Sequence, residues 1–219
     1  MFAFVEDDEN AMVESVSPLK LRRKPVQQRS RMTQNAVLDA FVRLLVEKGY
    51  AQLTMRDIAM VAGVGLGTLY EYFPGKKSIA AHCIHQRFKN VGTHMQGWIE
   101  EQKGQPLEVV AAHLVERIIC LHAENSAEWS ALIFLERQIS DAGAYQILYR
   151  QIVGIWEQAF CASSDAAAYA GKSAEVVHAA VYGVLYQKLM LAPHRLQEAG
   201  FAAQLRALVL GYLQVSLPE

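Results

Sequence analysis

Residues 54–73 read TMRDIAMVAGVGLGTLYEYF, and this stretch predicts two short helices joined by a tight turn. Thr54 and Asp57 have the spacing of a capping box, with Asp in the place of the more usual Glu or Gln, so a helix begins here. Gly63 marks the turn, because a tight connection between helices needs a positive φ that glycine adopts without strain. The second helix covers residues 66–73 and ends at a Pro-Gly pair. Such a helix-turn-helix presents its second helix as a rod that fits the DNA major groove.

A longer helix precedes this stretch and supplies a surface on which the two short helices can pack. Apolar side chains recur at helical spacing over residues 37–45, and Gly49 ends the helix. Ile58, Val64 and Leu69 are the apolar residues expected to hold the two short helices together. Because helices of this length are unstable alone, we expect packing against the longer helix to stabilise them.

The rest of the chain also predicts helices, and we find no alternating run that would indicate a strand. The fold class is therefore all-α, with about nine helices in total. We expect three parts: a tail over residues 1–28, a helix-turn-helix domain over 29–76, and a second helical domain over 77–219. The expected helices of the second domain run from 76 to 92 or 97 and over 106–123, 126–141, 144–161, 173–192 and 200–215.

The net charge of −1 conceals an uneven distribution along the chain. Residues 1–19 carry five acidic and no basic side chains, residues 20–90 carry thirteen basic and four acidic ones, and residues 91–219 carry eight basic and thirteen acidic ones. The central segment therefore has a net charge of +9 between two acidic segments. This pattern indicates a polyanionic partner for that segment, although a solvated charge run has the same appearance.

The sequence has the features of a cytoplasmic protein without membrane contact. Its longest run without Asp, Glu, Lys or Arg is the 13 residues 58–70, which include three glycines and are too short to span a bilayer. The acidic first nineteen residues are the opposite of a secretory or mitochondrial signal. The three cysteines form no CxxC motif, which favours free thiols in a reducing compartment.

The stretch from Thr33 to Lys77 resembles the TetR family of bacterial one-component transcriptional regulators. The resemblance covers about a quarter of the chain, and the remainder is similar in length and layout only. Position 65 departs from the family: it is Gly, where the family usually has a Ser helix cap. Glycine caps a helix at a cost of a few tenths of a kcal/mol, so the fold stands, but one phosphate contact is expected to be missing. The matching residues are Thr54-x-x-Asp57-Ile58-Ala59-x-x-Ala62-Gly63-Val64-x-x-Gly67-Thr68-Leu69-Tyr70-x-Tyr72-Phe73, then Lys76-Lys77 and Ile79.

The resemblance implies which residues contact double-stranded operator DNA. The first three residues of the recognition helix lie nearest the base edges, whereas two tyrosines and one of two adjacent lysines contact phosphates. Core packing is the alternative role for Tyr70. We expect the basic arm that ends at Arg31 to be disordered without DNA and to follow the duplex when bound. The predicted DNA-contacting residues are Arg29, Arg31, Thr54, Leu66, Gly67, Thr68, Tyr70, Tyr72, Lys76 and Lys77.

Other motifs do not indicate catalysis, a cofactor or a metal. Gly63-x-Gly65-x-Gly67 lacks the spacing of a dinucleotide fingerprint and follows a helix rather than a strand. His82, Cys83 and His85 are close in sequence, but a zinc site usually needs three or four ligands from several elements. There is no GxSxG, P-loop or HExxH motif. We therefore predict that the protein is not an enzyme.

An aromatic and apolar stripe in the second domain is either ordinary core or the wall of an effector site. It lies over residues 144–161, with a second stripe over 126–141 that includes Glu136. A carboxylate among apolar neighbours needs a partner, and the two alternatives are an ion pair with an arginine such as Arg117 or an anchor for an effector. The core of this domain is hollow in the family, so the effector-site candidates are Trp129, Ile133, Glu136, Tyr145, Tyr149 and Trp156.

The helix over 173–192 is apolar nearly all round, which predicts burial on both sides and hence a second subunit. The resemblance implies that this helix and the last one pair with their mates in a four-helix bundle. The predicted homodimer interface is Ala179, Ala180, Gly183, Leu205, Leu208 and Tyr212.

The resemblance implies a homodimeric transcriptional regulator, with a repressor released from its operator by a small-molecule effector as the first hypothesis. The alternative is a ligand-independent architectural or adaptor protein that binds DNA and has a solid second domain. An activator role, the effector and the operator are left open by the sequence.

Overall fold

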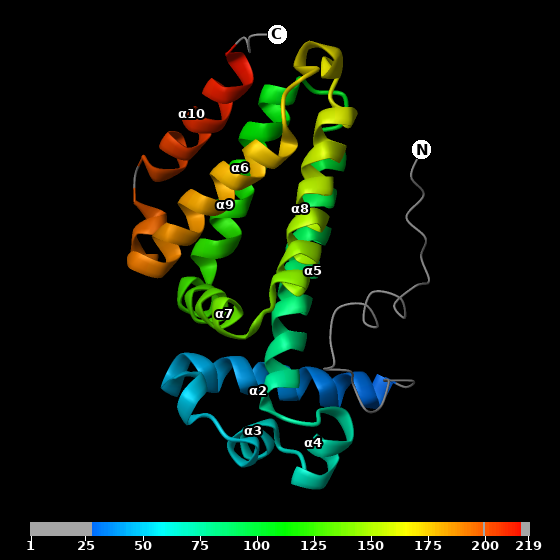
Figure 1. Ribbon diagram of the computed structural model, residues 1–219, viewed down its shortest axis with the longest axis vertical. Coiled ribbons are helices and arrows are strands. Elements are labelled where there is room, and N and C mark those ends of the chain that lie inside the picture. Colours follow the sequence, from blue (N-terminus) through cyan, green and yellow to red (C-terminus); the bar gives the residue numbers. More distant parts are fainter. Residues whose placement is uncertain (1–27, 199, 216–219) are drawn as a thin grey trace. The chain divides into compact units, whose positions relative to one another are not determined.

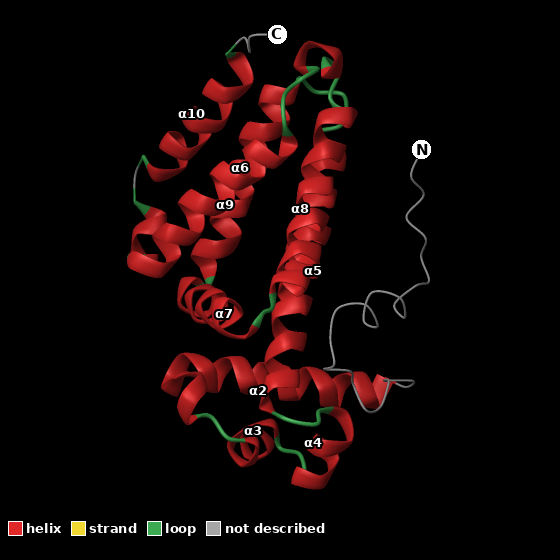
Figure 2. Cartoon of the chain, viewed as in Figure 1, coloured by secondary structure: helices red, strands yellow, loops and turns green. Residues whose placement is uncertain are grey.

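The structure is a computed structural model that describes residues 28–198 and 200–215. Within these ranges the backbone forms nine α-helices and two short 3-10 helices, without a strand (Figures 1 and 2). The expected all-α fold is therefore confirmed, whereas the predicted tail lies outside the described residues except for Gln28. The helices are α2 (Gln28–Gln52), α3 (Met55–Ala62), α4 (Leu66–Tyr72), α5 (Lys76–Glu101), α6 (Leu107–Glu124), α7 (Ser126–Ile139), α8 (Ala142–Ala162), η1 (Ala166–Tyr169), α9 (Ala174–Leu191), η2 (Pro193–Gln197) and α10 (Phe201–Gln214).

The chain divides into two compact units. Unit 1 contains the described residues up to His85 together with Leu135–Ile147, and unit 2 contains Gln86–Phe134 and the residues from Leu148 onward. The expected division after residue 76 differs from this one, because the first turns of α5 pack within unit 1. Cys83 Sγ, for example, lies 3.9 Å from the carbonyl oxygen of Leu38 in α2. Helices α5, α7 and α8 each contribute residues to both units.

Unit 1 has the predicted apolar core beneath the helix-turn-helix. Phe41 of α2, Ile58 of α3 and Leu69 of α4 are all fully buried, and α2 packs against α3 as α3 does against α4. Gly49 has φ 74° and ψ 162°, so the regular part of α2 ends at the predicted residue. Gly63 has φ 67° and ψ 30°, the left-handed conformation expected of the turn glycine.

Unit 2 is a larger helical bundle in which α10 packs against α6 and α9. Trp156 of α8 and Leu114 of α6 are fully buried in its core. Gly92 permits a close approach of α5 and α8, because a Cβ there would lie 2.9 Å from Cδ1 of Ile155. All three cysteines are free, as expected. Among the described helices, none combines the length and apolar character that a membrane span requires.

Candidate DNA interface, effector residues and subunit surface

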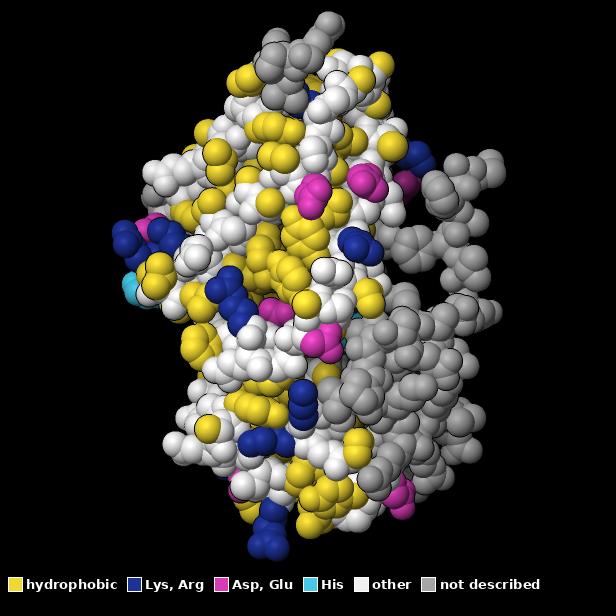
Figure 3. All heavy atoms as spheres, in the orientation of Figure 1, with side chains coloured by type: hydrophobic (Ala, Val, Ile, Leu, Met, Phe, Trp, Pro, Cys, Tyr) yellow, Lys and Arg dark blue, Asp and Glu magenta, His cyan; other side chains and the backbone are white. Residues whose placement is uncertain are grey.

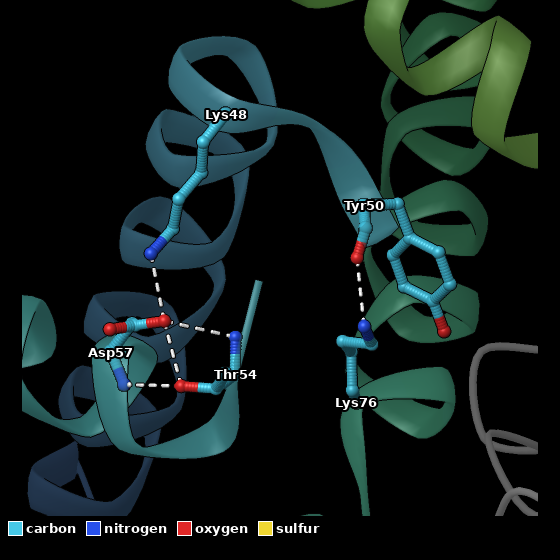
Figure 4. A network of polar contacts seen from close by, with 5 residues as sticks. All are labelled: Lys48, Tyr50, Thr54, Asp57 and Lys76. Carbon is cyan, nitrogen blue, oxygen red and sulfur yellow. Dashed lines mark hydrogen bonds and ion pairs between the residues drawn. The ribbon is translucent and has the colours of Figure 1, made fainter. Parts of the chain in front are cut away.

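The helix-turn-helix begins with a reciprocal capping box that fixes the start of α3. The Thr54 hydroxyl accepts a hydrogen bond from the Asp57 amide at 3.2 Å, and Asp57 Oδ2 accepts from the Thr54 amide at 3.1 Å (Figure 4). Lys48 Nζ of α2 lies 2.7 Å from the same carboxylate oxygen. The hydrogen bonds from Lys48 and Thr54 lower the pKa of Asp57 to about 2. The predicted DNA contact Thr54 is exposed, but its hydroxyl is already engaged in this cap.

The short helix α4 separates its side chains cleanly into two sets. Leu69 and the following Phe73 are fully buried, as expected for core residues. Leu66, Gly67 and Thr68 are exposed in the first turn, where the resemblance implies base contacts. The cap residue Gly65 forms no side-chain hydrogen bond, which agrees with the absence of the usual Ser.

The two tyrosines of α4 have opposite environments. Tyr70 is 40% exposed, which favours a surface role over the core-packing alternative. Tyr72 is only 5% exposed, so its ring belongs to the core of unit 1 and offers little surface to a phosphate. The prediction for Tyr72 is corrected accordingly: residues 69, 72 and 73 lie on the buried side of a helix too short to be stable without that burial.

The structure distinguishes the two adjacent lysines at the start of α5. Lys76 Nζ donates a hydrogen bond to the carbonyl oxygen of Tyr50 at 2.8 Å and lies 4.4 Å from the centre of the Tyr50 ring (Figure 4). Lys77 is exposed. Lys76 therefore joins the end of α2 to the start of α5, whereas the charge of Lys77 lies in solvent.

Three exposed cations in helices α2, α3 and the first turn of α5 have no carboxylate partner among the described residues. They are Arg31 of α2, Arg56 of α3 and Lys77 of α5, whereas Arg43 pairs with Glu47 and Lys48 with Asp57. Arg31 and Lys77 were predicted DNA contacts, and Arg56 was missed. Its signal in the sequence is its place directly before the capping Asp57, on the open first turn of a short helix. The backbone of Arg29 lies in α2, and its side chain is outside the described residues.

The effector-site candidates fall into both units and differ in burial. Trp129, Ile133 and Trp156 are buried in the core of unit 2, and Tyr149 is half-buried there. Tyr145 belongs to unit 1 and is 37% exposed.

Glu136 belongs to unit 1 and is buried, as its place among apolar residues predicts. Burial raises the pKa of its carboxyl, while a hydrogen bond from Ser140 and the charge of Arg137 oppose this rise. Arg117, the arginine named for the ion-pair alternative, belongs to unit 2, where its guanidinium lies 5.1 Å from the centre of the Trp98 ring.

Unit 2 contains a continuous row of aromatic rings that sequence reasoning did not assemble. Helix α9 contributes three rings at intervals of four residues, and α8, α6 and α7 add one ring each. Successive ring centres are 4.8, 5.5, 3.9, 6.1 and 4.2 Å apart. The four-residue spacing on α9 was the available signal. In order, the row is Tyr149, His178, Tyr182, Tyr186, His122 and Trp129.

Helices α9 and α10 expose small and apolar residues along one side. On α9, Ala179 and Gly183 are exposed and Ala180 is half-buried. A Cβ at Gly183 would meet no atom within 4 Å, so no intrachain packing explains this glycine. The neighbouring exposed apolar residues are Val176, Val184 and Leu191 on α9 and Leu208 on α10.

Two of the predicted α10 interface residues have roles within the chain. Leu205 is 1% exposed and belongs to the core of unit 2, so it has no surface to offer a partner, and this prediction is corrected. It shares the inner side of α10 with Val209 and Leu213, which follow at four-residue spacing and are also buried. Tyr212 is half-buried, and its hydroxyl accepts a hydrogen bond from the Ser173 amide at 2.8 Å.

Comparison with known proteins places the helix-turn-helix in a family. The sequence profile described as bacterial regulatory proteins of the tetR family matches residues 37–83. The chain is 33% identical over 66 residues to the HTH-type transcriptional regulator YvkB of Bacillus subtilis, which is 30% of this chain and 35% of YvkB. It is 36% identical over 55 residues to the HTH-type transcriptional repressor KstR of Rhodococcus jostii, which is 25% of this chain and 26% of KstR. These matches thus span about a third or less of each relative.

Solved structures are similar over most of the chain. GusR of Salmonella enterica aligns with a TM-score of 0.66 and 22% identity, covering 88% of this chain and all of that one. SmeT in complex with triclosan aligns at 0.61 with 21% identity, covering 85% and 99%. FadR of Bacillus subtilis in complex with stearoyl-CoA aligns at 0.64 with 18% identity, covering 82% and 97%. The profile match assigns the helix-turn-helix segment, residues 37–83, to the tetR family of bacterial regulatory proteins, and the solved structures share the fold of the chain over most of its length.

Proposed function

We propose that this protein is a homodimeric repressor that binds operator DNA through α4 and is released when a small molecule binds unit 2. The observation that carries the DNA-binding part is the charge of unit 1. Arg31, Arg56 and Lys77 are exposed and have no carboxylate partner among the described residues. Unpaired surface cations suit phosphate contacts, which position a protein on the duplex and supply most of its salt-dependent affinity.

Base recognition is assigned to the first turn of α4. Thr68 is exposed there, and its hydroxyl and methyl can contact a base edge and the thymine methyl. Leu66 can make only apolar contacts, so we expect sequence discrimination to depend on few side chains. Tyr70 adds an exposed phenol hydroxyl for a phosphate.

Dimerisation is assigned to the exposed sides of α9 and α10. Small residues at 179 and 183 let two helix backbones approach closely across a two-fold axis. A glycine inside a helix costs about 0.5–1 kcal/mol relative to alanine. Close approach of a partner helix is a physical reason for Gly183 that the single chain does not provide. Two recognition helices held in this way can reach successive major grooves.

Control by a small molecule is supported by the structural neighbours. SmeT and FadR are described as complexes with triclosan and stearoyl-CoA, and KstR is described as a repressor. In physical terms, the effector must bind more tightly to the conformation that does not bind DNA. The alternative, a ligand-independent DNA-binding protein with a solid second domain, predicts that no small molecule changes operator affinity.

Selection of duplexes from a random library, followed by fluorescence anisotropy, tests this function. We expect one palindromic site to bind far more tightly than a scrambled duplex. Lys77→Ala should weaken binding to both duplexes about equally. Thr68→Ala should reduce the difference in affinity between the selected site and the scrambled duplex. Lys103→Ala, an exposed lysine of unit 2 that pairs with Glu100 at 2.9 Å, is the matched control and should change neither. Binding of all duplexes alike by the wild-type protein would contradict the proposal.

A further inference from the structure

The buried imidazole of His122 has one nitrogen that the fold leaves without a hydrogen bond. His122 lies in the last turn of α6 and is 2% exposed. Its Nδ1 lies 2.7 Å from the carbonyl oxygen of Ile118. A carbonyl oxygen only accepts, so Nδ1 carries the proton and donates it. Nε2 is buried and has no hydrogen-bond partner among the described residues.

The charge state of this ring follows from its surroundings. Burial lowers the pKa of His122 to about 4, against the smaller opposing effect of the Ile118 carbonyl. At neutral pH the ring is therefore uncharged and Nε2 is a bare acceptor. Leaving a buried acceptor unsatisfied costs about 1–3 kcal/mol, and no hydrogen bond from the residues described in the structure offsets this cost.

The aromatic row flanks the His122 ring and connects it to half-buried tyrosines. The His122 ring stands 4.2 Å from Trp129 and 6.1 Å from Tyr186, centre to centre. Tyr149 and Tyr182 are half-buried, whereas Tyr186, His122 and Trp129 are buried, so the row leads from the surface of unit 2 to the bare nitrogen. On the face in Figure 3, hydrophobic side chains line a hollow in the region where Figure 1 places α8 and α9.

The chemistry of the row selects against charged molecules. None of its six residues is an acid, a lysine or an arginine, and burial also lowers the pKa of His178 to about 4, so both histidines are neutral at pH 7. A buried charge without a partner is strongly unfavourable. Flat aromatic molecules, in contrast, stack well on ring edges and faces at separations of about 4.5–7 Å.

We infer that the aromatic row is the effector subsite, and that it takes an uncharged aromatic compound whose O–H or N–H donates a hydrogen bond to Nε2 of His122. This inference rests on the proposed function and names the chemical class of its effector. Trp129 and Tyr149, two residues from the sequence-based set, then act as parts of this row. His122, Tyr182 and Tyr186 complete it, and Glu136 is not required for recognition.

A matched series of probes tests the inference by calorimetry on the full-length protein. The probes are 2-naphthol, 2-methoxynaphthalene, which has the ring without the donor, and 2-naphthoate, which has the ring with a negative charge. We expect 2-naphthol to bind about tenfold more tightly than either of the others, the change that one satisfied buried hydrogen bond produces. Equal binding of 2-naphthol and 2-methoxynaphthalene, or no binding of 2-naphthol, would overturn the inference.

The His122→Phe variant retains a ring but removes the acceptor. It should bind 2-naphthol about tenfold less tightly than the wild type and bind 2-methoxynaphthalene unchanged. His113→Phe is the matched control, because His113 Nε2 is also buried on α6 but lies 3.6 Å from a Glu101 carboxylate oxygen, outside the row. It should leave both affinities unchanged. If His122→Phe loses nothing, or if both variants lose affinity alike, the inference is wrong.

A measurement without any substitution keeps the test independent of variant folding. The ¹⁵N resonance of the His122 Nε2 should move when 2-naphthol binds and should stay in place with 2-methoxynaphthalene. A resonance that is unaffected by bound 2-naphthol overturns the inference. Direct binding also separates this inference from the proposed function. If 2-naphthol binds more tightly than 2-methoxynaphthalene but does not release DNA, only the proposed effector control is wrong. If 2-naphthol releases DNA equally well from the wild type and from His122→Phe, only the assignment of the aromatic row as the subsite is wrong.

Discussion

The ammonium group of Lys76 donates a hydrogen bond to the backbone carbonyl of Tyr50, 2.8 Å away, across 26 residues of sequence (Figure 4). This contact joins the start of α5 to the last residues of α2, just after the Gly49 kink, and the neighbouring Lys77 makes no such contact. The two lysines are adjacent in sequence, yet Lys76 stabilises the fold of unit 1 and Lys77 is exposed.

Lys76→Ala should therefore lower the stability of the protein, whereas Lys77→Ala should lower its affinity for DNA. Lys76→Ala removes a charge-assisted hydrogen bond and a cation–π contact, so we expect the free energy of unfolding to fall by about 1–2 kcal/mol. Lys77→Ala should leave stability unchanged and weaken binding to any duplex. Urea unfolding and anisotropy on a non-operator duplex measure the two effects. Equal losses of DNA affinity with unchanged stability in both variants would contradict the assignment.

Gly67 tests whether DNA lies against the recognition helix. A Cβ at Gly67 would meet no atom within 4 Å, so Gly67→Ala should stabilise the free protein by about 0.5–1 kcal/mol through helix propensity. If DNA approaches this residue closely, the added methyl should lower operator affinity. Gly97→Ala on α5 is the matched control, since it is exposed and its Cβ would also meet no atom within 4 Å. We expect it to gain stability without any change in DNA affinity.

Two buried histidines and the half-buried His82 predict an acid-sensitive fold. Burial lowers the pKa of His82, His122 and His178 to about 4 each, from 6.5. Between these values the unfolded chain binds up to three more protons than the folded one, so stability is full above pH 6.5 and is lost as the pH falls toward 4. Each proton contributes a slope of about 1.4 kcal/mol per pH unit. Urea unfolding at pH 7.5, 6 and 5 checks this, and His122→Phe should reduce the slope by about one proton.

The subunit surface is tested by Gly183→Leu. Leucine at this exposed position adds bulk where two α9 helices are proposed to meet, and overpacking typically costs about 1–3 kcal/mol at each of two symmetric sites. Sedimentation should shift toward monomer, and operator affinity should fall because a monomer holds only one half-site. Gly97→Leu, the same change at another open helical glycine, should remain dimeric. A dimeric Gly183→Leu variant with normal operator affinity would show that α9 is not the interface.

Local rules predicted most of the fold because they involve neighbours in sequence. The capping box at Thr54, the helix stop at Gly49 and the turn at Gly63 each depend on a few adjacent residues, and all were confirmed. The burial of Leu69 and Phe73 follows from helical periodicity.

Long-range contacts account for what the sequence did not predict. The role of Lys76 depends on a carbonyl in another segment, and the burial of Tyr72 depends on how α4 meets the core of unit 1. The aromatic row takes its rings from four helices. The sequence shows the four-residue spacing of the three rings on α9, but it does not show which rings of α6, α7 and α8 pack beside them. The cation–π contact between Arg117 and Trp98 likewise joins α6 to α5, nineteen residues apart in sequence.

The salt dependence of operator binding tests the DNA-binding role most directly. If Arg31, Arg56 and Lys77 of each subunit contact phosphates, about six counterions are released per dimer. A plot of log affinity against log salt concentration should then have a slope of about −5 or steeper. Lys77→Ala should make that slope shallower by about two, one for each subunit. A slope near zero for the wild-type protein would contradict the assignment of unit 1 as the DNA-binding surface.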